Sequence, residues 1–123
     1  MGVLEDKELS IGLEGSGVVT DVGTGVTDLH IGDRVIYLNN NCFATRITIS
    51  ATKCAKIPQN ISYEEAATLP AVYATVIHSL LDVGGLQSGQ SVLIHSACGG
   101  IGVAALNICQ SIGRVQVSHF PFQ

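Results

Sequence analysis

A glycine cluster between an apolar run and a long helix-compatible segment is the feature that most restricts how this chain of 123 residues can fold. The apolar run is Ser91-Val92-Leu93-Ile94-His95, and the cluster that follows is Cys98-Gly99-Gly100-Ile101-Gly102. The next residues are compatible with a helix as far as Ile112, and Gly113 is its expected end. The sequence therefore predicts a strand, a tight turn and a helix, in that order.

The turn itself has the spacing A-x-G-x-x-G, from Ala97 through Gly99 to Gly102. A small first residue permits a tight turn, Gly99 allows a pyrophosphate to approach the backbone, and Gly102 allows the helix to pack closely on the strand. The free amides at the helix N-terminus favour an anion there. We predict a phosphate-binding turn for a dinucleotide, and the alternative is a glycine-rich turn with no ligand.

The rest of a dinucleotide fingerprint is missing. A residue that holds the ribose or a 2′-phosphate is expected about 20 residues further on, where the chain reads His119-Phe120-Pro121-Phe122-Gln123. The sequence motif alone therefore does not decide between NAD and NADP.

Composition excludes several classes of protein. Hydrophobic residues make up 46% of the chain and charged residues 13%, which excludes a disordered, collagen-like or coiled-coil chain. The formal net charge is −4 and the six basic residues are scattered, so we expect no nucleic-acid partner. The basic residues are Lys7, Arg34, Arg46, Lys53, Lys56 and Arg114.

The four cysteines, Cys42, Cys54, Cys98 and Cys109, form no C-x-x-C pair. We therefore expect free thiols and no zinc site. The first ten residues include Glu5, Asp6, Lys7 and Glu8 where a signal peptide would be apolar, and later apolar runs are too short to span a membrane. The expected location is the cytoplasm, without a membrane partner.

The first half of the chain indicates β structure. Strands are predicted at 18–22, at 34–38 and, from alternating polar and apolar residues, at 43–50. The S-x-x-E spacing from Ser62 to Glu65 predicts a capping box, and thus a helix from about Ser62 to near Leu69. A second helix is predicted from about Val72 to Val83.

These motifs, taken together, resemble the medium-chain dehydrogenase/reductase superfamily and, within it, the enoyl reductase domain of fungal highly reducing polyketide synthases. The resembling stretches are Gly12 to Val19, Gly32 to Val35, Cys42 to Thr45, Glu64 to Pro70, Val72 to Thr75 and Gly89 to Gly100. Zinc enzymes of the superfamily have a histidine before the glutamate of the first motif. Here Leu13 precedes Glu14, so the resemblance is to the zinc-independent, quinone-oxidoreductase-like branch.

The resemblance implies an α/β fold with a β-rich part. A partial GroES-like substrate domain would span 1–57, connecting helices 58–86, and the first βαβ portion of a truncated Rossmann domain 87–123. The implied activity is hydride transfer from NADPH to the β-carbon of an α,β-unsaturated acyl thioester held on an acyl carrier protein. A homodimer in the parent synthase is a further expectation.

Site residues carry over from the family one by one. Ala97, Gly99, Gly100 and Gly102 match the pyrophosphate turn, and Thr75 matches a threonine near the nicotinamide. No catalytic residue is assigned. For the other candidates a role other than catalysis is favoured: an ion pair or turn hydrogen bond for Glu14, packing beneath the cofactor for Tyr73, core hydrogen bonds for His78 and His95, and small size for Cys98.

The family continues well beyond the first βαβ unit, and the lysine and aspartate proposed as proton donors in some of these reductases would lie there. We therefore expect an inactive fragment of an enoyl reductase. Two alternatives stay open: a quinone-oxidoreductase-like enzyme acting on free enones or quinones, and a nonenzymatic remnant of a truncated gene.

Overall fold

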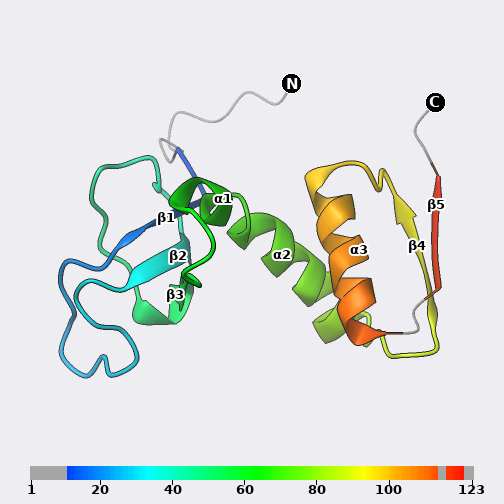
Figure 1. Ribbon diagram of the computed structural model, residues 1–123, viewed down its shortest axis with the longest axis horizontal. Helices are drawn as coiled ribbons and strands as arrows, with labels where there is room; N and C mark the ends of the chain where they lie inside the picture. The colour runs from blue at the N-terminus through cyan, green and yellow to red at the C-terminus, as the bar shows by residue number, and fades with distance from the viewer. Residues whose placement is uncertain (1–10, 114–115, 121–123) are drawn as a thin grey trace. The chain divides into compact units, whose positions relative to one another are not determined.

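A computed structural model describes residues 11–113 and 116–120. By contact the chain divides into two compact units, residues 1–70 and 71–123 (Figure 1). Each unit is described by itself. The three-part division into 1–57, 58–86 and 87–123 stays a prediction.

The first unit contains a three-stranded antiparallel sheet in the order β1-β2-β3. Its strands are β1 (Glu14–Val18), β2 (Arg34–Leu38) and β3 (Cys54–Lys56), and the 3₁₀ turn η1 (Ala51–Lys53) leads into β3. The bounds of β2 are those predicted from the sequence, whereas β3 was not predicted. Val35 on the central strand is buried.

The prediction of a strand at 18–22 is wrong, because the strand lies four residues earlier, at 14–18. Gly15 pairs with Tyr37 across the sheet. A Cβ atom added at Gly15 would lie 2.7 Å from the Tyr37 hydroxyl, so the strand contains glycine where the tyrosine ring covers it. Pairing with β2, and not the β-branched composition, sets the position of β1.

The prediction of a strand at 43–50 is also wrong, because bends and irregular backbone occupy this segment. Its backbone hydrogen bonds run locally, from the Ala44 amide to the Cys42 carbonyl, and to the chain before β1, from the Phe43 amide to the Ile11 carbonyl. The Phe43 side chain is 86% exposed. An alternating pattern without a neighbouring strand to pair with does not make a sheet.

Helix α1 (Tyr63–Ala67) begins where the capping box predicts. The Ser62 hydroxyl accepts from the Glu65 amide at 3.1 Å, and the Glu65 carboxylate accepts from the Ser62 amide at 2.9 Å. Arg34 of β2 binds the segment that leads into α1. Its guanidinium donates to the Ile61 carbonyl at 2.5 Å and lies over the Tyr63 ring. The first turn of the helix is thereby fixed to the sheet.

The second unit begins with a helix that changes its hydrogen-bond pattern. Helix α2 (Pro70–Val76) continues directly as the π-helical segment η2 (Ile77–Val83), where the sequence predicted one α-helix from Val72 to Val83. The Thr75 hydroxyl donates to the Ala71 carbonyl at 2.7 Å, and the Ser79 hydroxyl donates to the Thr75 carbonyl. Hydroxyls bonded to helix carbonyls disturb regular helix geometry, in keeping with the change at this point.

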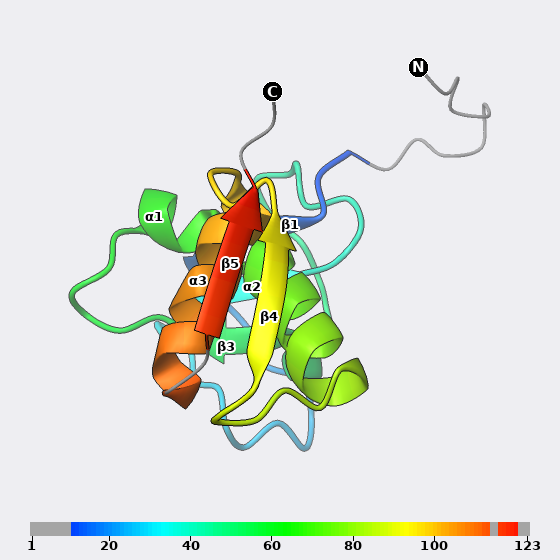
Figure 2. The ribbon, with the colours of Figure 1, turned by 90° about the vertical axis from the view of Figure 1, so that its right-hand side faces the viewer.

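The remainder of this unit is a strand-helix-strand motif: β4 (Ser91–His95), α3 (Gly100–Ile112) and β5 (Gln116–Phe120). β4 has the predicted extent, and α3 ends at Ile112 as predicted but begins inside the glycine cluster, at Gly100. Gly113 caps α3 with a φ of 74°. Strands β4 and β5 pair in parallel, with both helices on the same side of the pair (Figure 2). Ile94 is buried in the core, whereas the residue before it on β4, Leu93, is half exposed.

The core of this unit is built mainly from small side chains, Ala97, Ala104, Ala105 and Cys109, together with Val76 and Ile94. The expected fold class, α/β with a β-rich part, is confirmed: a three-stranded antiparallel sheet is combined with helices and a parallel α/β element. Among the described residues, no helix has the length and apolar character needed to cross a bilayer.

Candidate functional site: the glycine turn

The turn between β4 and α3 is formed by backbone hydrogen bonds and by one residue in the left-handed region. Ser96, directly after β4, has a φ of 55°, and its carbonyl accepts from the Gly99 amide at 3.0 Å. Gly99 is the N-cap of α3 and has extended backbone angles. Its carbonyl accepts the first bond of the helix, from Val103 at 2.9 Å. The sequence-predicted strand, turn and helix are thus all present.

The glycines of this turn have different steric surroundings. A Cβ atom at Gly102 would lie 2.5 Å from the Ala97 Cα atom and 2.6 Å from the Ser96 oxygen, both backbone atoms that cannot move aside cheaply. A Cβ atom at Gly99 would meet only the Ser96 oxygen, at 3.5 Å, and one at Gly100 only a methyl group of Val72, also at 3.5 Å. The fold therefore requires glycine at 102 but not at 99 or 100.

The N-terminus of α3 is suited to a negatively charged group. No side chain caps it, and its first turn contains no acidic residue. Gly99 and Gly100 are exposed, so the first amides of a helix of 13 residues are accessible from outside. These amides and the helix dipole both favour an anion, and the absence of Cβ atoms allows that anion to approach the backbone.

Of the predicted site residues, the structure brings Ala97, Gly99, Gly100 and Gly102 together in one turn. Thr75 lies on α2, which contacts this turn through Val72 and Gly100. The Thr75 side chain is exposed, and its hydroxyl proton is committed to the Ala71 carbonyl. The hydroxyl oxygen remains available as an acceptor.

The histidines differ from expectation. We predicted core positions for His78 and His95, but both are exposed, because η2 and the end of β4 present them to solvent. The His78 Nδ1 atom lies 3.3 Å from an Asp82 carboxylate oxygen, one helical turn away. Neither histidine is part of the core cluster.

Tyr73 packs against the core of the second unit, and its hydroxyl has a partner that the sequence did not reveal. The Asn107 side-chain amide on α3 donates to the Tyr73 hydroxyl at 2.8 Å. The two residues are 34 positions apart, and neither belongs to a recognisable motif. No sequence signal would have paired them.

The thiols and Glu14 show no sign of reactive chemistry. Burial raises the pKa of the Cys54 and Cys109 thiols, which keeps them protonated at neutral pH. Cys98 is exposed in the glycine turn, and Glu14 is half-buried on β1. Within residues 11–113 and 116–120, no three histidine, cysteine or acidic residues gather as metal ligands would.

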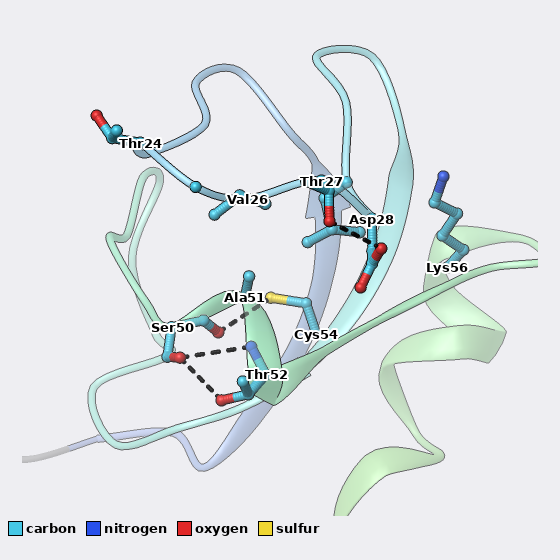
Figure 3. A pocket seen from close by; sticks show the side chains of 11 residues that line it. Thr24, Val26, Thr27, Asp28, Ser50, Ala51, Thr52, Cys54 and Lys56 are labelled. Atoms are coloured by element: carbon cyan, nitrogen blue, oxygen red, sulfur yellow. Dashed lines mark hydrogen bonds between the residues drawn. The ribbon is translucent and has the colours of Figure 1, made fainter.

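A pocket of about 600 Å³ lies in the first unit, between the 24–29 loop and the segment around η1 (Figure 3). Hydroxyl side chains line much of it, including those of Thr27 and Ser50, which bond to Asp28 and Thr52 respectively. The Lys56 ammonium at its edge lies 2.8 Å from the Asp33 carboxylate. The positive charge of Lys56 is therefore paired with Asp33. The residues that line the pocket offer no cluster of hydrogen-bond donors comparable to the glycine turn.

Comparison with known protein families identifies the family of this chain. The profile of the alcohol dehydrogenase GroES-like domain matches residues 3–79, and the chain belongs to this family. It is also similar to highly reducing polyketide synthases. Over 117 residues, or 95% of the chain, it is 68% identical to one from Alternaria alternata and 62% identical to one from Gibberella moniliformis. The chain spans 4% of the length of each of these synthases.

Solved structures of enoyl and quinone reductases are also similar to this chain. The CurK enoyl reductase is 33% identical, with a TM-score of 0.83 over 95% of this chain and 35% of its own. A quinone oxidoreductase of Escherichia coli, solved with NADPH, is 29% identical, with a TM-score of 0.74 over 89% of this chain and 34% of its own. The resemblance to the medium-chain dehydrogenase/reductase superfamily and its polyketide synthase branch is thereby confirmed.

Proposed function

We propose that this chain is part of an NADPH-dependent enoyl reductase of polyketide synthase type, to which it contributes the phosphate-binding turn. The substrate would be an α,β-unsaturated acyl thioester carried on an acyl carrier protein, and the product its saturated counterpart. The similarity to polyketide synthases and to the CurK enoyl reductase supports the reaction. The NADPH complex of the E. coli quinone oxidoreductase supports the cofactor.

The observation that carries the proposal is the contrast between Gly99 and Gly102. Packing explains Gly102, but nothing inside the protein requires the absence of a side chain at Gly99. A glycine that is exposed, unstrained and next to accessible helix amides is suited to the close approach of an external group. A pyrophosphate is the group that matches these donors and this spacing.

When bound, NADPH would supply the hydride that reduces the β-carbon. The chain's own residues would bind and orient it: the amides at the start of α3 by holding the pyrophosphate, and Thr75 by offering its hydroxyl oxygen near the nicotinamide. Orientation of this kind accounts for much of the rate enhancement of hydride transfer. The proton donor for the α-carbon is not assigned to any residue of this chain.

The assignment is tested by Gly99→Val in the 123-residue chain, titrated with NADPH while the amide NMR signals of residues 99–103 are followed. A branched side chain at the pyrophosphate position should weaken binding by more than about tenfold. Gly23→Val is the matched control, because Gly23 is an exposed glycine of the first unit and a Cβ atom added there meets nothing within 4 Å. Equal NADPH affinity of the Gly99→Val variant and the unsubstituted chain would refute the site.

A second candidate function is reduction of free quinones or enones, favoured by the likeness to quinone oxidoreductases. Acyl thioester and quinone substrates, compared in a parent enzyme, distinguish the two. A protein that binds no nucleotide and reduces neither substrate would instead fit a nonenzymatic remnant.

Three further expectations belong to this proposal. The reductase would be zinc-independent, because Leu13 precedes Glu14, and metal analysis of the purified protein tests this. A homodimer of the parent synthase and the three-part organisation of the chain, with boundaries near residues 57 and 86, stay proposals for the longer protein.

A further inference from the structure

The packing of α3 determines where this helix lies along its neighbour α2. The fully buried residues of α3 are small, Ala104, Ala105 and Cys109, while Leu106 and Ile108 pack against the same core and stay partly exposed. At the start of the helix, Gly102 lies directly against the backbone of the turn. The close Gly102 contact holds the first turn of α3. The position of the rest of the helix depends on contacts further along it, because an interior is close-packed and each contact restricts how a helix can lie. The position of the glycine turn depends on this placement, because the turn forms the start of α3.

Two neighbouring residues of α2, Val72 and Tyr73, lie beside α3 at different points along it. Val72 meets Gly100 at the first turn of α3, and Tyr73 meets Asn107 two helical turns further along. The first contact is apolar and has no directional preference. The second is a hydrogen bond of 2.8 Å, which requires both a distance and an angle.

We propose that Asn107 is a positioning residue for dinucleotide binding, acting through Tyr73. Its hydrogen bond sets the register of α3 against α2, and thereby the placement of the glycine turn relative to Thr75, two residues beyond Tyr73. This inference rests on the proposed function, in which the turn holds the pyrophosphate and Thr75 lies near the nicotinamide. Asn107 would not touch the nucleotide itself.

A positioning role predicts an effect that depends on how much of the site a ligand spans. NADPH would contact both the glycine turn and the Thr75 region, whereas 2′-phospho-ADP-ribose lacks the nicotinamide and would contact the turn alone. Asn107→Ala should therefore weaken NADPH binding about threefold to tenfold, the range expected for one hydrogen bond, and leave the affinity for 2′-phospho-ADP-ribose unchanged. General loosening of the fold would weaken both.

The experiment titrates the 123-residue chain with each nucleotide by NMR. Tyr73→Phe should reproduce the selective loss, and the double variant should show no larger loss than either single one. The matched control is Gln110→Ala, an exposed amide on the same helix, which should leave both affinities unchanged. Thermal unfolding of each variant shows whether it is folded.

The outcomes separate the two proposals. If the unsubstituted chain binds neither nucleotide, the proposed function fails and the role of Asn107 fails with it. If the unsubstituted chain binds both nucleotides and the Asn107 and Tyr73 variants do so equally well, only the positioning role is overturned. A parallel loss of both affinities would likewise overturn it and indicate a structural role.

Discussion

At the scale of single residues, the glycine turn shows how one residue type serves two purposes. The spacing of Ala97, Gly99 and Gly102 is readable from the sequence, and so is the strand-turn-helix order around it. The sequence does not show which glycine the fold itself needs, because that depends on how closely Gly102 approaches the backbone of Ala97. The structure separates a packing requirement at Gly102 from an open position at Gly99.

This separation predicts different effects on stability. Gly102→Ala should lower the free energy of unfolding by about 3 kcal/mol, because the new methyl group would overlap backbone atoms of Ser96 and Ala97. Gly99→Ala has room for its methyl group and should cost less than about 1 kcal/mol, mainly through poorer N-capping. Urea denaturation measures both values. Similar losses at the two positions would contradict the steric argument.

At the scale of elements, the sequence predicts what local chemistry determines. The capping box at Ser62 and Glu65 gives the start of α1, and Gly113 gives the end of α3. The wrong strand predictions fall where contacts with residues distant in the sequence determine the secondary structure. Gly15 lies in β1 because Tyr37 covers it, and the 43–50 segment lacks a strand to pair with. The Tyr73 to Asn107 bond was not predictable for the same reason.

The capping box also predicts how the stability of α1 depends on pH. Hydrogen bonds from the Ser62 amide and hydroxyl lower the pKa of Glu65 below its ordinary value of 4.5. The charged form is therefore favoured in the folded state. Its stabilising effect is fully present above about pH 4.5 and is lost as the pH falls through the lowered pKa. Thermal unfolding at pH 7 and pH 3 should show this loss.

Glu65→Gln is the informative variant for this test. Glutamine can still accept from the Ser62 amide but cannot titrate, so its stability should change less between pH 7 and pH 3. Glu64→Gln is the matched control, since Glu64 is adjacent and exposed but outside the box. A Glu65→Gln variant with the same pH dependence as the unsubstituted chain would exclude this carboxylate as the cause.

Arg34 joins β2 to the segment that leads into α1, and this gives a further prediction. Its guanidinium donates to the Ile61 and Pro58 carbonyls and stacks on Tyr63, a combination that a lysine cannot reproduce. Arg34→Lys should therefore lower the free energy of unfolding by about 1–2 kcal/mol, measured by urea denaturation. Arg46→Lys, at an exposed position, should have almost no effect. Equal effects at both positions would show that charge alone matters at Arg34.

At the scale of the whole molecule, each unit has a core of its own. Leu29, Val35, Cys42 and Ile57 are buried in the first unit, and the second has its separate small-residue cluster. The described sheet of the second unit has two parallel strands, and Leu93 on β4 is 50% exposed. Parallel sheets are normally covered on both faces, so the second unit gains less from burial than such a sheet usually does.

The last prediction concerns the activity of the 123-residue chain when it is assayed alone. Binding a dinucleotide costs about 4–15 kcal/mol in lost freedom of motion, and the described residues offer mainly the amides of one turn to offset it. The chain also spans only 35% of the CurK enoyl reductase. We therefore expect weak NADPH binding and no measurable reduction of a crotonyl thioester, followed by the absorbance of the reduced nicotinamide. A complete enoyl reductase serves as the positive control. Turnover near a typical enzyme rate of about 10 per second would show that these residues suffice for the reaction.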